Sequence, residues 1–318
     1  MNFRSINDLC NLIRNKISLV PSDVDLIIGI PRSGLLAANY IALLLNKPLT
    51  DIEGFVDGRI LSSGRTKDIS HNVDKISDAK KILIVDDSIA SGASLKKCRD
   101  IIREKNIKSK IIYCAIYALP SSKKYVDIYF EIVNSPRIFE WNLFSHTLFL
   151  PKMCFDIDGV LCEDPQPVDN DDGKNYRRFL SHAKPKIRPT GNIGYIVTSR
   201  LERYREETVS WLKYNKIQYN NLIMLNSTAQ DRLNNNMHAI FKADYYKKSN
   251  SILFIESDEN QAVEINNLSC KPVYCVENGK FYSGNKKYEI RFESKAKIRA
   301  FFRKFKILRM VYHKFANR

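Results

Sequence analysis

The stretch ILIVDDSIASGAS, at residues 82–94, decides the fold of the first half of this 318-residue chain. Four apolar residues, Ile82–Val85, have the length and composition of a buried strand. Asp86 and Asp87 follow, and the small residues at 90–94 lead into a helical pattern. A strand, a small-residue turn and a helix in this order are typical of an α/β sheet, in which ligands bind at the carboxyl ends of the strands.

The same alternation runs along the rest of the chain in two series. The first series has predicted strands at 25–30, 81–85, 110–117 and 126–133 and helices at 33–45 and 92–104. The second has strands at 153–157, 194–198, 222–225 and 251–255 and a helix at 203–213. The β-α-β order indicates two Rossmann-like α/β domains with mostly parallel sheets. With a boundary near 148–152, we predict one domain over 1–149, a second over 150–291 and a tail over 292–318.

Composition supports a globular, reduced protein. The hydrophobic fraction is 44%, which is ample for two cores. The seven cysteines are an odd number and none has zinc-ligand spacing, so we interpret them as free thiols in a cytoplasmic protein. The first twenty residues lack the apolar run of a signal peptide, and no segment reaches the roughly 18 apolar residues of a membrane span.

The residues of the opening stretch suit a phosphorylated sugar. Adjacent carboxylates at Asp86 and Asp87 can accept hydrogen bonds from sugar hydroxyls, and a small-residue turn at a helix start can close its N–H groups on a phosphate. The stretch resembles the thirteen-residue signature of type I phosphoribosyltransferases, which bind phosphoribosyl pyrophosphate (PRPP). The loop GIPRSG at 29–34 resembles the pyrophosphate loop of that family, with Arg32 meeting a pyrophosphate oxygen.

The resemblance implies displacement of pyrophosphate from ribose C1, with Mg²⁺ and basic loop residues neutralising the leaving group. We expect Asp86 and Asp87 to act in catalysis. The residues expected to bind PRPP are Arg32, Ser33, Gly34, Arg59, Arg65, Asp86, Asp87, Ser88, Ala90, Ser91, Gly92, Ala93 and Ser94.

Two assignments in the first half stay open. Arg59, Arg65 and Lys67 lie where the family places its mobile catalytic loop, but the same composition suits an ordinary surface loop. The acceptor site of the family varies, and the segments available for it are 1–20 and 134–146. Within the second segment Glu140 and Trp141 are acceptor-site candidates, whereas Phe139 and Phe144 are expected to pack.

A second stretch, MCFDIDGVL at 153–161, carries different chemistry. Asp156 follows an apolar strand and can attack phosphorus, and Asp158 can protonate the leaving oxygen and later activate water. The stretch resembles motif one of the haloacid-dehalogenase (HAD) phosphatases. The resemblance implies that Thr198 binds the phosphoryl group, that Lys242 balances charge, with Lys247 as a rival, and that Glu256 ligates Mg²⁺ with Asp156 and the Asp158 carbonyl.

The second half also departs from the commoner HAD pattern. Glu256 stands where paired aspartates are usual, and this leaves open whether Asp258 supports the metal. Only about forty residues separate Asp158 from Thr198, so we predict a HAD-like fold with a small cap or none. The acidic insert at 163–172 either rims the site or is a solvated loop.

The tail carries much of the net charge of +16, because nine basic residues and no acidic one fall within 294–318. Apolar residues between Ile298 and Phe315 have helical spacing, and such a basic amphipathic helix is typical of a membrane surface. Packing on the body and nucleic-acid binding are the alternatives, and we expect no nucleic acid because the apolar face would be wasted on phosphates.

Together these features predict a bifunctional enzyme. The pairing resembles enzymes that install ribofuranose in bacterial surface polysaccharides, which implies PRPP, Mg²⁺ and a lipid-linked glycan acceptor at the inner face of the cell membrane. Two other interpretations stay open: nucleobase salvage with a fused nucleotide phosphatase, and a PRPP-sensing regulator.

Overall fold

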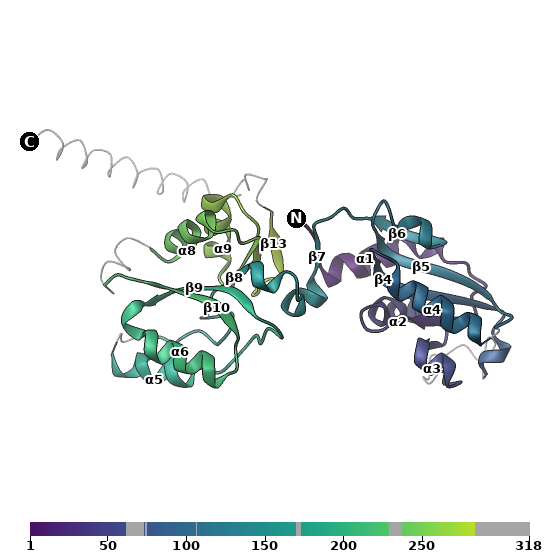
Figure 1. Cartoon of the computed structure of the whole chain (residues 1–318), viewed down its shortest axis with the longest axis horizontal. Coiled ribbons are helices and arrows are strands. Elements are labelled where there is room, and N and C mark those ends of the chain that lie inside the picture. The colour runs from purple at the N-terminus through teal and green to yellow at the C-terminus, as the bar shows by residue number, and fades with distance from the viewer. Residues whose placement is uncertain (62–72, 74, 106, 170–172, 229–236, 284–318) are drawn as a thin grey trace, which may run out of the picture.

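The computed structural model describes residues 1–61, 73, 75–105, 107–169, 173–228 and 237–283. These residues form two α/β lobes, each built on its own parallel or mostly parallel sheet (Figure 1). The predicted α/β class with parallel sheets is therefore confirmed. Arg65, Lys67 and the predicted tail helix lie outside the described residues.

The first lobe has a five-stranded parallel sheet in the order β3-β2-β4-β5-β6. Its strands are β2 (Leu26–Gly29), β3 (Leu49–Asp51), β4 (Lys81–Ile89), β5 (Lys110–Ala118) and β6 (Ile128–Ile132). Its helices are α1 (Ile6–Lys16), α2 (Gly34–Leu45), α3 (Ile52–Val56) and α4 (Ala93–Glu104).

Successive side chains of a β-strand point to opposite faces of the sheet, so neighbouring residues of β4 lie on different faces. Leu83 and Val85 share a buried cluster with α1 and α2, whereas Ile82 and Ile84 share one with α3 and α4. Burial on both faces explains why this strand is an unbroken apolar run.

The central strand is longer than the sequence predicts. The apolar run predicts that β4 ends at Val85, but the strand continues to Ile89. Pairing with β5 carries on past the apolar run, with Asp86 opposite Ala115 and Ser88 opposite Tyr117. The two acids thus lie within the carboxyl-terminal half of the strand and not beyond its end. The strand can continue past the apolar run because backbone pairing does not depend on side-chain hydropathy.

The second lobe has a six-stranded sheet in the order β10-β9-β8-β11-β12-β13, parallel except for the last strand. Its strands are β8 (Met153–Phe155), β9 (Ile193–Leu201), β10 (Tyr219–Leu225), β11 (Leu253–Glu256), β12 (Val273–Cys275) and β13 (Lys280–Tyr282). Its helices are α5 (Lys174–His182), α6 (Arg205–Tyr214), α8 (Met237–Lys248) and α9 (Glu259–Ser269).

Helices cover both faces of this second sheet. Cys154 and Phe254 pack with α8 and α9, and Phe155 and Ile255 pack on the other face with α6. Figure 1 shows α8 and α9 on one side of the sheet and α5 and α6 on the other. No helix in the described ranges is long and apolar enough to cross a bilayer.

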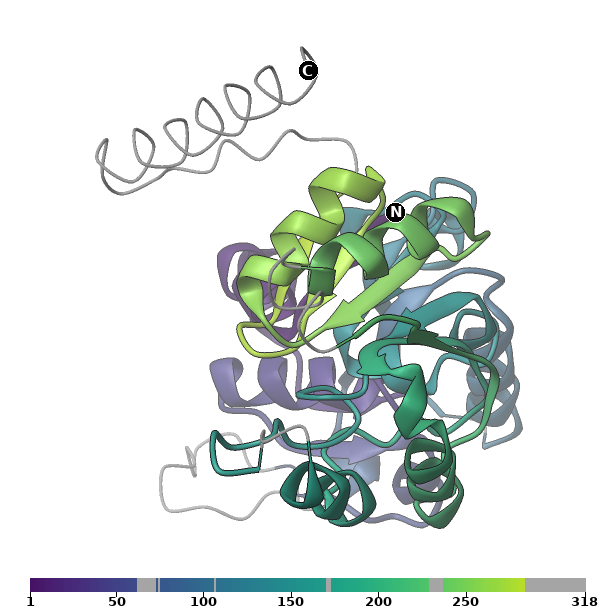
Figure 2. The ribbon, with the colours of Figure 1, turned by 90° about the vertical axis from the view of Figure 1, so that its left-hand side faces the viewer.

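A short segment joins the lobes. Strand β1 (Asn2–Arg4) pairs in parallel with β7 (Arg137–Phe139), which leads into a 3₁₀ helix (Glu140–Ser145). Phe3 stacks on Phe281 of the second lobe with ring centroids 4.7 Å apart. Glu140 accepts hydrogen bonds from the Ile6 amide at 2.7 Å and the Tyr274 hydroxyl at 3.0 Å. The second lobe therefore packs against the segment that follows β6. Figure 2 looks along the long axis, with the second lobe nearer the viewer and the first lobe behind it.

Two candidate functional sites

The first candidate site lies where β2 and β4 end. The Ser33 hydroxyl donates to Asp87 Oδ1 at 2.7 Å and so ties the loop after β2 to the paired acids. Gly34 begins α2 so close to β4 that an added Cβ would lie 2.8 Å from the Val85 carbonyl oxygen. The two loops that the sequence singles out are therefore brought together, and only glycine fits at their contact.

Asp87 accepts hydrogen bonds from other side chains of the protein at both of its carboxylate oxygens. It is buried, and its second oxygen accepts a hydrogen bond from Trp141 Nε1 at 2.9 Å. Trp141 in turn stacks on Phe139 with ring centroids 4.8 Å apart. Asp86 is the more exposed of the two acids, so the pair divides into an inner carboxylate that holds the loops and an outer one that faces the site.

The chain after β4 provides the backbone expected of a phosphate site. Gly92 has a φ of +77° and forms the N-cap of α4, a conformation that favours glycine. Ala90, Ser91, Ala93 and Ser94 are exposed around it, and Ser88 lies just before them on β4. A helix N-terminus with small exposed residues can bind an anion through its free N–H groups.

The basic residues of the first site differ in placement. Arg32 is exposed at the tip of the loop after β2. Arg59 is also exposed, and its Nη2 pairs with Asp51 Oδ2 at the end of β3, at 3.4 Å.

The segment that carries the acceptor-site candidates holds a residue that the sequence did not single out. Glu140 bridges the lobes, and Phe139 is buried as expected. Arg137 Nη2 donates to the Ile89 carbonyl at 2.8 Å, at the end of β4. Its Nη1 is buried and has no partner among the residues that the structure describes. No sequence signal distinguishes this arginine from other basic residues.

Asp86 should make the stability of the protein depend on pH. Burial, followed by the charge of Asp87, raises the pKa of Asp86 to about 8. The folded protein therefore keeps a proton that the unfolded chain loses near pH 4, and the stability contributed by this group falls as pH rises between these values. Between about pH 5 and about pH 8, we expect the free energy of unfolding of wild type to fall by about 2–4 kcal/mol relative to that of Asp86→Asn. Urea denaturation measures this difference. Asp100→Asn, a half-exposed aspartate on α4, is the control, and a wild-type-to-variant difference independent of pH would refute the assignment.

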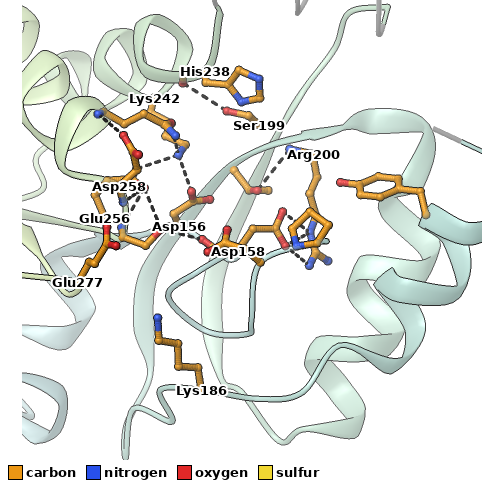
Figure 3. Close-up of a pocket in the computed structure, with 16 residues that line it drawn as sticks. Asp156, Asp158, Lys186, Ser199, Arg200, His238, Lys242, Glu256, Asp258 and Glu277 are labelled. Carbon is orange, nitrogen blue, oxygen red and sulfur yellow. Dashed lines mark hydrogen bonds and ion pairs between the residues drawn. The ribbon is translucent and has the colours of Figure 1, made fainter. Parts of the chain in front are cut away.

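The second candidate site is a cavity of about 420 Å³ at the carboxyl ends of β8, β9 and β11 (Figure 3). The residues of the sequence prediction that line it are Asp156, Asp158, Thr198, Lys242, Glu256 and Asp258. They come from positions up to about a hundred residues apart. The fold therefore brings these six predicted residues of the second half into one cavity.

A buried lysine lies between the two innermost carboxylates. Lys242 Nζ pairs with Asp156 Oδ2 and, at 2.8 Å, with Glu256 Oε2. Burial alone lowers the pKa of Lys242, but Asp156 and Glu256 more than offset it, so the pKa is raised. Burial raises the pKa of Glu256, and Lys242 opposes that shift. Lys247 is exposed on the same helix, so the structure puts Lys242 and not its rival in the cavity.

Asp158 faces an arginine, Arg200, that no sequence motif marks. Arg200 is buried, and its Nη2 lies 2.6 Å from Asp158 Oδ1 while its Nε lies 3.1 Å from Oδ2. Burial alone lowers the pKa of Arg200, but Asp158 more than offsets it and the pKa is raised. Thr198, the predicted phosphoryl-binding residue, is buried beside this pair, and its hydroxyl accepts a hydrogen bond from the Arg200 amide at 3.3 Å.

The donor set fits a hard divalent cation. The Ser257 hydroxyl lies 3.3 Å from the Asp158 carbonyl and 3.5 Å from Glu256 Oε1, so these two oxygens are neighbours. Asp156 Oδ2 shares Lys242 Nζ with Glu256 Oε2, so a third carboxylate oxygen lies close to Glu256. Oxygen ligands of this kind are those that Mg²⁺ prefers. Within the described ranges no three acidic, histidine or cysteine side chains form a metal cluster.

Two neighbours of the cavity have other tasks. Asp258 caps α9 by accepting a hydrogen bond from the Gln261 amide at 2.7 Å. Gly159 has a φ of +73°, and an added Cβ would overlap the Ser257 hydroxyl. Of the acidic insert, Asp164 lines the cavity; residues 171 and 172 lie outside the described part.

The geometry defines an α/β protein with two polar sites, each at the carboxyl edge of a largely parallel sheet. Residues 4–148 match the family model of the phosphoribosyl transferase domain. The first lobe is therefore a phosphoribosyltransferase domain, which supports a PRPP-dependent transferase.

Solved structures resemble part of the chain. The Helicobacter pylori xanthine-guanine-hypoxanthine phosphoribosyltransferase is 15% identical, with a TM-score of 0.32, over 45% of this chain and 92% of that one. The Pyrococcus horikoshii purine phosphoribosyltransferase is 20% identical, with a TM-score of 0.30, over 44% and 94%. The Aeropyrum pernix orotate phosphoribosyltransferase is 16% identical, with a TM-score of 0.27, over 40% and 69%. No curated protein shows significant sequence similarity to the chain.

Proposed function

We propose that the chain is a bifunctional enzyme that transfers 5-phosphoribose from PRPP to a glycan acceptor and then removes the 5-phosphate. The observation that carries this proposal is the presence in one chain of a phosphoribosyltransferase domain and a cavity in which Lys242 pairs with Asp156 and Glu256 while Asp158 stands free of that lysine. The second lobe is, in this proposal, a HAD-like phosphatase without a large cap.

In the transfer step the first lobe holds the donor. The backbone at 90–94 binds the 5-phosphate, Asp86 accepts hydrogen bonds from the ribose hydroxyls, and the loop at 31–34 binds the pyrophosphate. Asp87 keeps this loop in place through Ser33. The acceptor hydroxyl attacks ribose C1, the bond from C1 to the pyrophosphate oxygen breaks, and the hydroxyl proton leaves with the pyrophosphate. Positive charge on the loops stabilises the departing anion.

In the hydrolytic step Asp156 attacks the phosphorus of the ribose 5-phosphate group. The bond from phosphorus to the sugar oxygen breaks, and Asp158 gives its proton to that oxygen. Water then attacks the aspartyl phosphate, Asp158 takes up a proton from it, and Asp156 is released with inorganic phosphate. Mg²⁺ bound by Asp156, Glu256 and the Asp158 carbonyl would neutralise charge on the phosphoryl oxygens.

The coupling of the two steps explains why one chain would hold both sites. Hydrolysis of a phosphate ester is effectively irreversible in water, so it draws a reversible transfer forward. A basic, amphipathic tail, which the sequence predicts, would attract an anionic membrane by about 1 kcal/mol per basic residue near the surface. A lipid-linked glycan at the inner face of the cell membrane is therefore the proposed acceptor, with the chain bound peripherally.

The acceptor class is tested by incubating the full chain with PRPP and Mg²⁺ in three reactions: with a lipid-linked glycan extract from a bacterial membrane, with a set of free nucleobases, and without an acceptor. We expect pyrophosphate and then phosphate to be released only with the glycan extract. Release with a free base would replace the proposal by nucleobase salvage. Flotation with anionic liposomes, with and without residues 294–318, tests the membrane partner separately.

A further inference from the structure

The ion pair between Arg200 and Asp158 is among the most buried charge contacts in the described part of the chain. The Arg200 side chain is 0% exposed and that of Asp158 is 20% exposed. A buried guanidinium without a partner costs several kcal/mol, so this arginine needs Asp158 to remain at its side. Its other contacts, the Thr208 hydroxyl at 3.4 Å and the Cys162 sulfur at 3.3 Å, are uncharged.

The two oxygens of Asp158 are held unequally. Oδ1 receives Arg200 Nη2 at 2.6 Å, Nε at 3.2 Å and the Cys162 thiol at 3.4 Å. Among the residues that the structure describes, Oδ2 receives only Nε, at 3.1 Å. The planar guanidinium therefore fixes the plane of the carboxyl group and leaves Oδ2 as the oxygen with capacity to spare.

From these contacts we infer that Arg200 is a positioning residue that holds Asp158 so that its Oδ2 faces the leaving oxygen of the phosphate ester. The inference rests on the proposed phosphatase function and adds to it the group that orients the acid. When the bond from phosphorus to the leaving oxygen breaks, the electron pair goes to that oxygen and the proton on Asp158 Oδ2 follows. The carboxylate that this transfer leaves forms the ion pair with Arg200. Figure 3 shows Arg200 approaching Asp158 from the side away from Lys242.

Comparing the hydrolysis of two phosphate esters distinguishes a role in positioning the acid from a general structural role. The alkoxide of ribose 5-phosphate needs a proton to leave, whereas the phenolate of p-nitrophenyl phosphate does not. kcat/KM reports the steps up to departure of the leaving group. For Arg200→Lys, which keeps the charge but loses the fork, we expect kcat/KM to fall about 100-fold with ribose 5-phosphate. With p-nitrophenyl phosphate we expect a change of no more than about threefold, which also shows that the variant is folded.

Two further variants complete the test. Arg205→Lys changes an arginine that pairs with Glu202 on the surface and should leave both values unchanged. Asp158→Asn should give the same dependence on the leaving group, and adding Arg200→Lys to it should cost nothing more, because the two residues act together.

Four results would overturn the inference. Equal losses on the two esters would make Arg200 a structural residue, and additive losses in the double variant would separate it from Asp158. A wild-type protein that hydrolyses neither ester would overturn the phosphatase proposal and this role with it. Normal hydrolysis that Arg200→Lys leaves unchanged would reject the role alone.

Discussion

Replacing Asp156 by asparagine is expected to reduce phosphate release by about 10⁴-fold or more, since loss of a covalent nucleophile has costs of this order. The amide has nearly the same shape as the carboxylate but cannot attack phosphorus. Lys242 keeps Glu256 as a partner in the variant, so the cavity should persist. Pyrophosphate release by the first lobe should continue, and the transferred ribose should keep its 5-phosphate.

Phosphate and pyrophosphate can be followed separately in one time course with PRPP, Mg²⁺ and acceptor. Asp244→Asn is a matched control, because Asp244 is an exposed aspartate on α8 that pairs only with Lys248 among the described residues. The control should release phosphate at the wild-type rate. Undiminished phosphate release by Asp156→Asn would remove Asp156 from the mechanism.

Replacing Lys242 by methionine is expected to destabilise the protein by about 3–5 kcal/mol. Methionine retains the length of the side chain but leaves Asp156 and Glu256 facing each other without a cation in a buried site. Urea denaturation measures this loss. Since Glu256 can take up a proton to relieve the repulsion, the loss should be smaller at about pH 5 than at about pH 8.

Lys247→Met provides the comparison for this prediction. Lys247 belongs to the same helix and is exposed, and such surface substitutions change stability by no more than about 0.5 kcal/mol. Adding Glu256→Gln to Lys242→Met should restore part of the stability, because it removes one of the two facing charges. Equal effects of the two lysine variants would mean that the pairing of Lys242 contributes nothing.

Much of the fold follows from the sequence, because apolar runs, small-residue turns and helical patterns recur in β-α-β order. The length of the central strand does not. Asp86 and Asp87 look like the end of β4, yet its ladder with β5 runs on to Ile89. Side-chain polarity marks where a strand leaves the core, whereas the backbone ladder continues for as long as the neighbouring strand does.

The candidate sites likewise contain some residues that the sequence locates and others that it does not. Asp156, Thr198, Lys242 and Glu256 each stand at a recognisable position relative to a strand, so their order along the chain locates them. Arg200 meets Asp158 across 42 positions, and Trp141 meets Asp87 across 54. Neither partner is marked by local pattern, since an arginine after a strand or a tryptophan in a loop has many other uses. Contacts of this kind depend on how the elements pack.

The central claim is that the second lobe removes the phosphate from the product of the first. The most direct measurement is mass spectrometry of the glycan product made from PRPP and a membrane glycan extract by wild type and by Asp156→Asn. Wild type should add a plain pentose, and the variant should add a pentose that still carries one phosphate. Identical products from the two proteins would contradict the account.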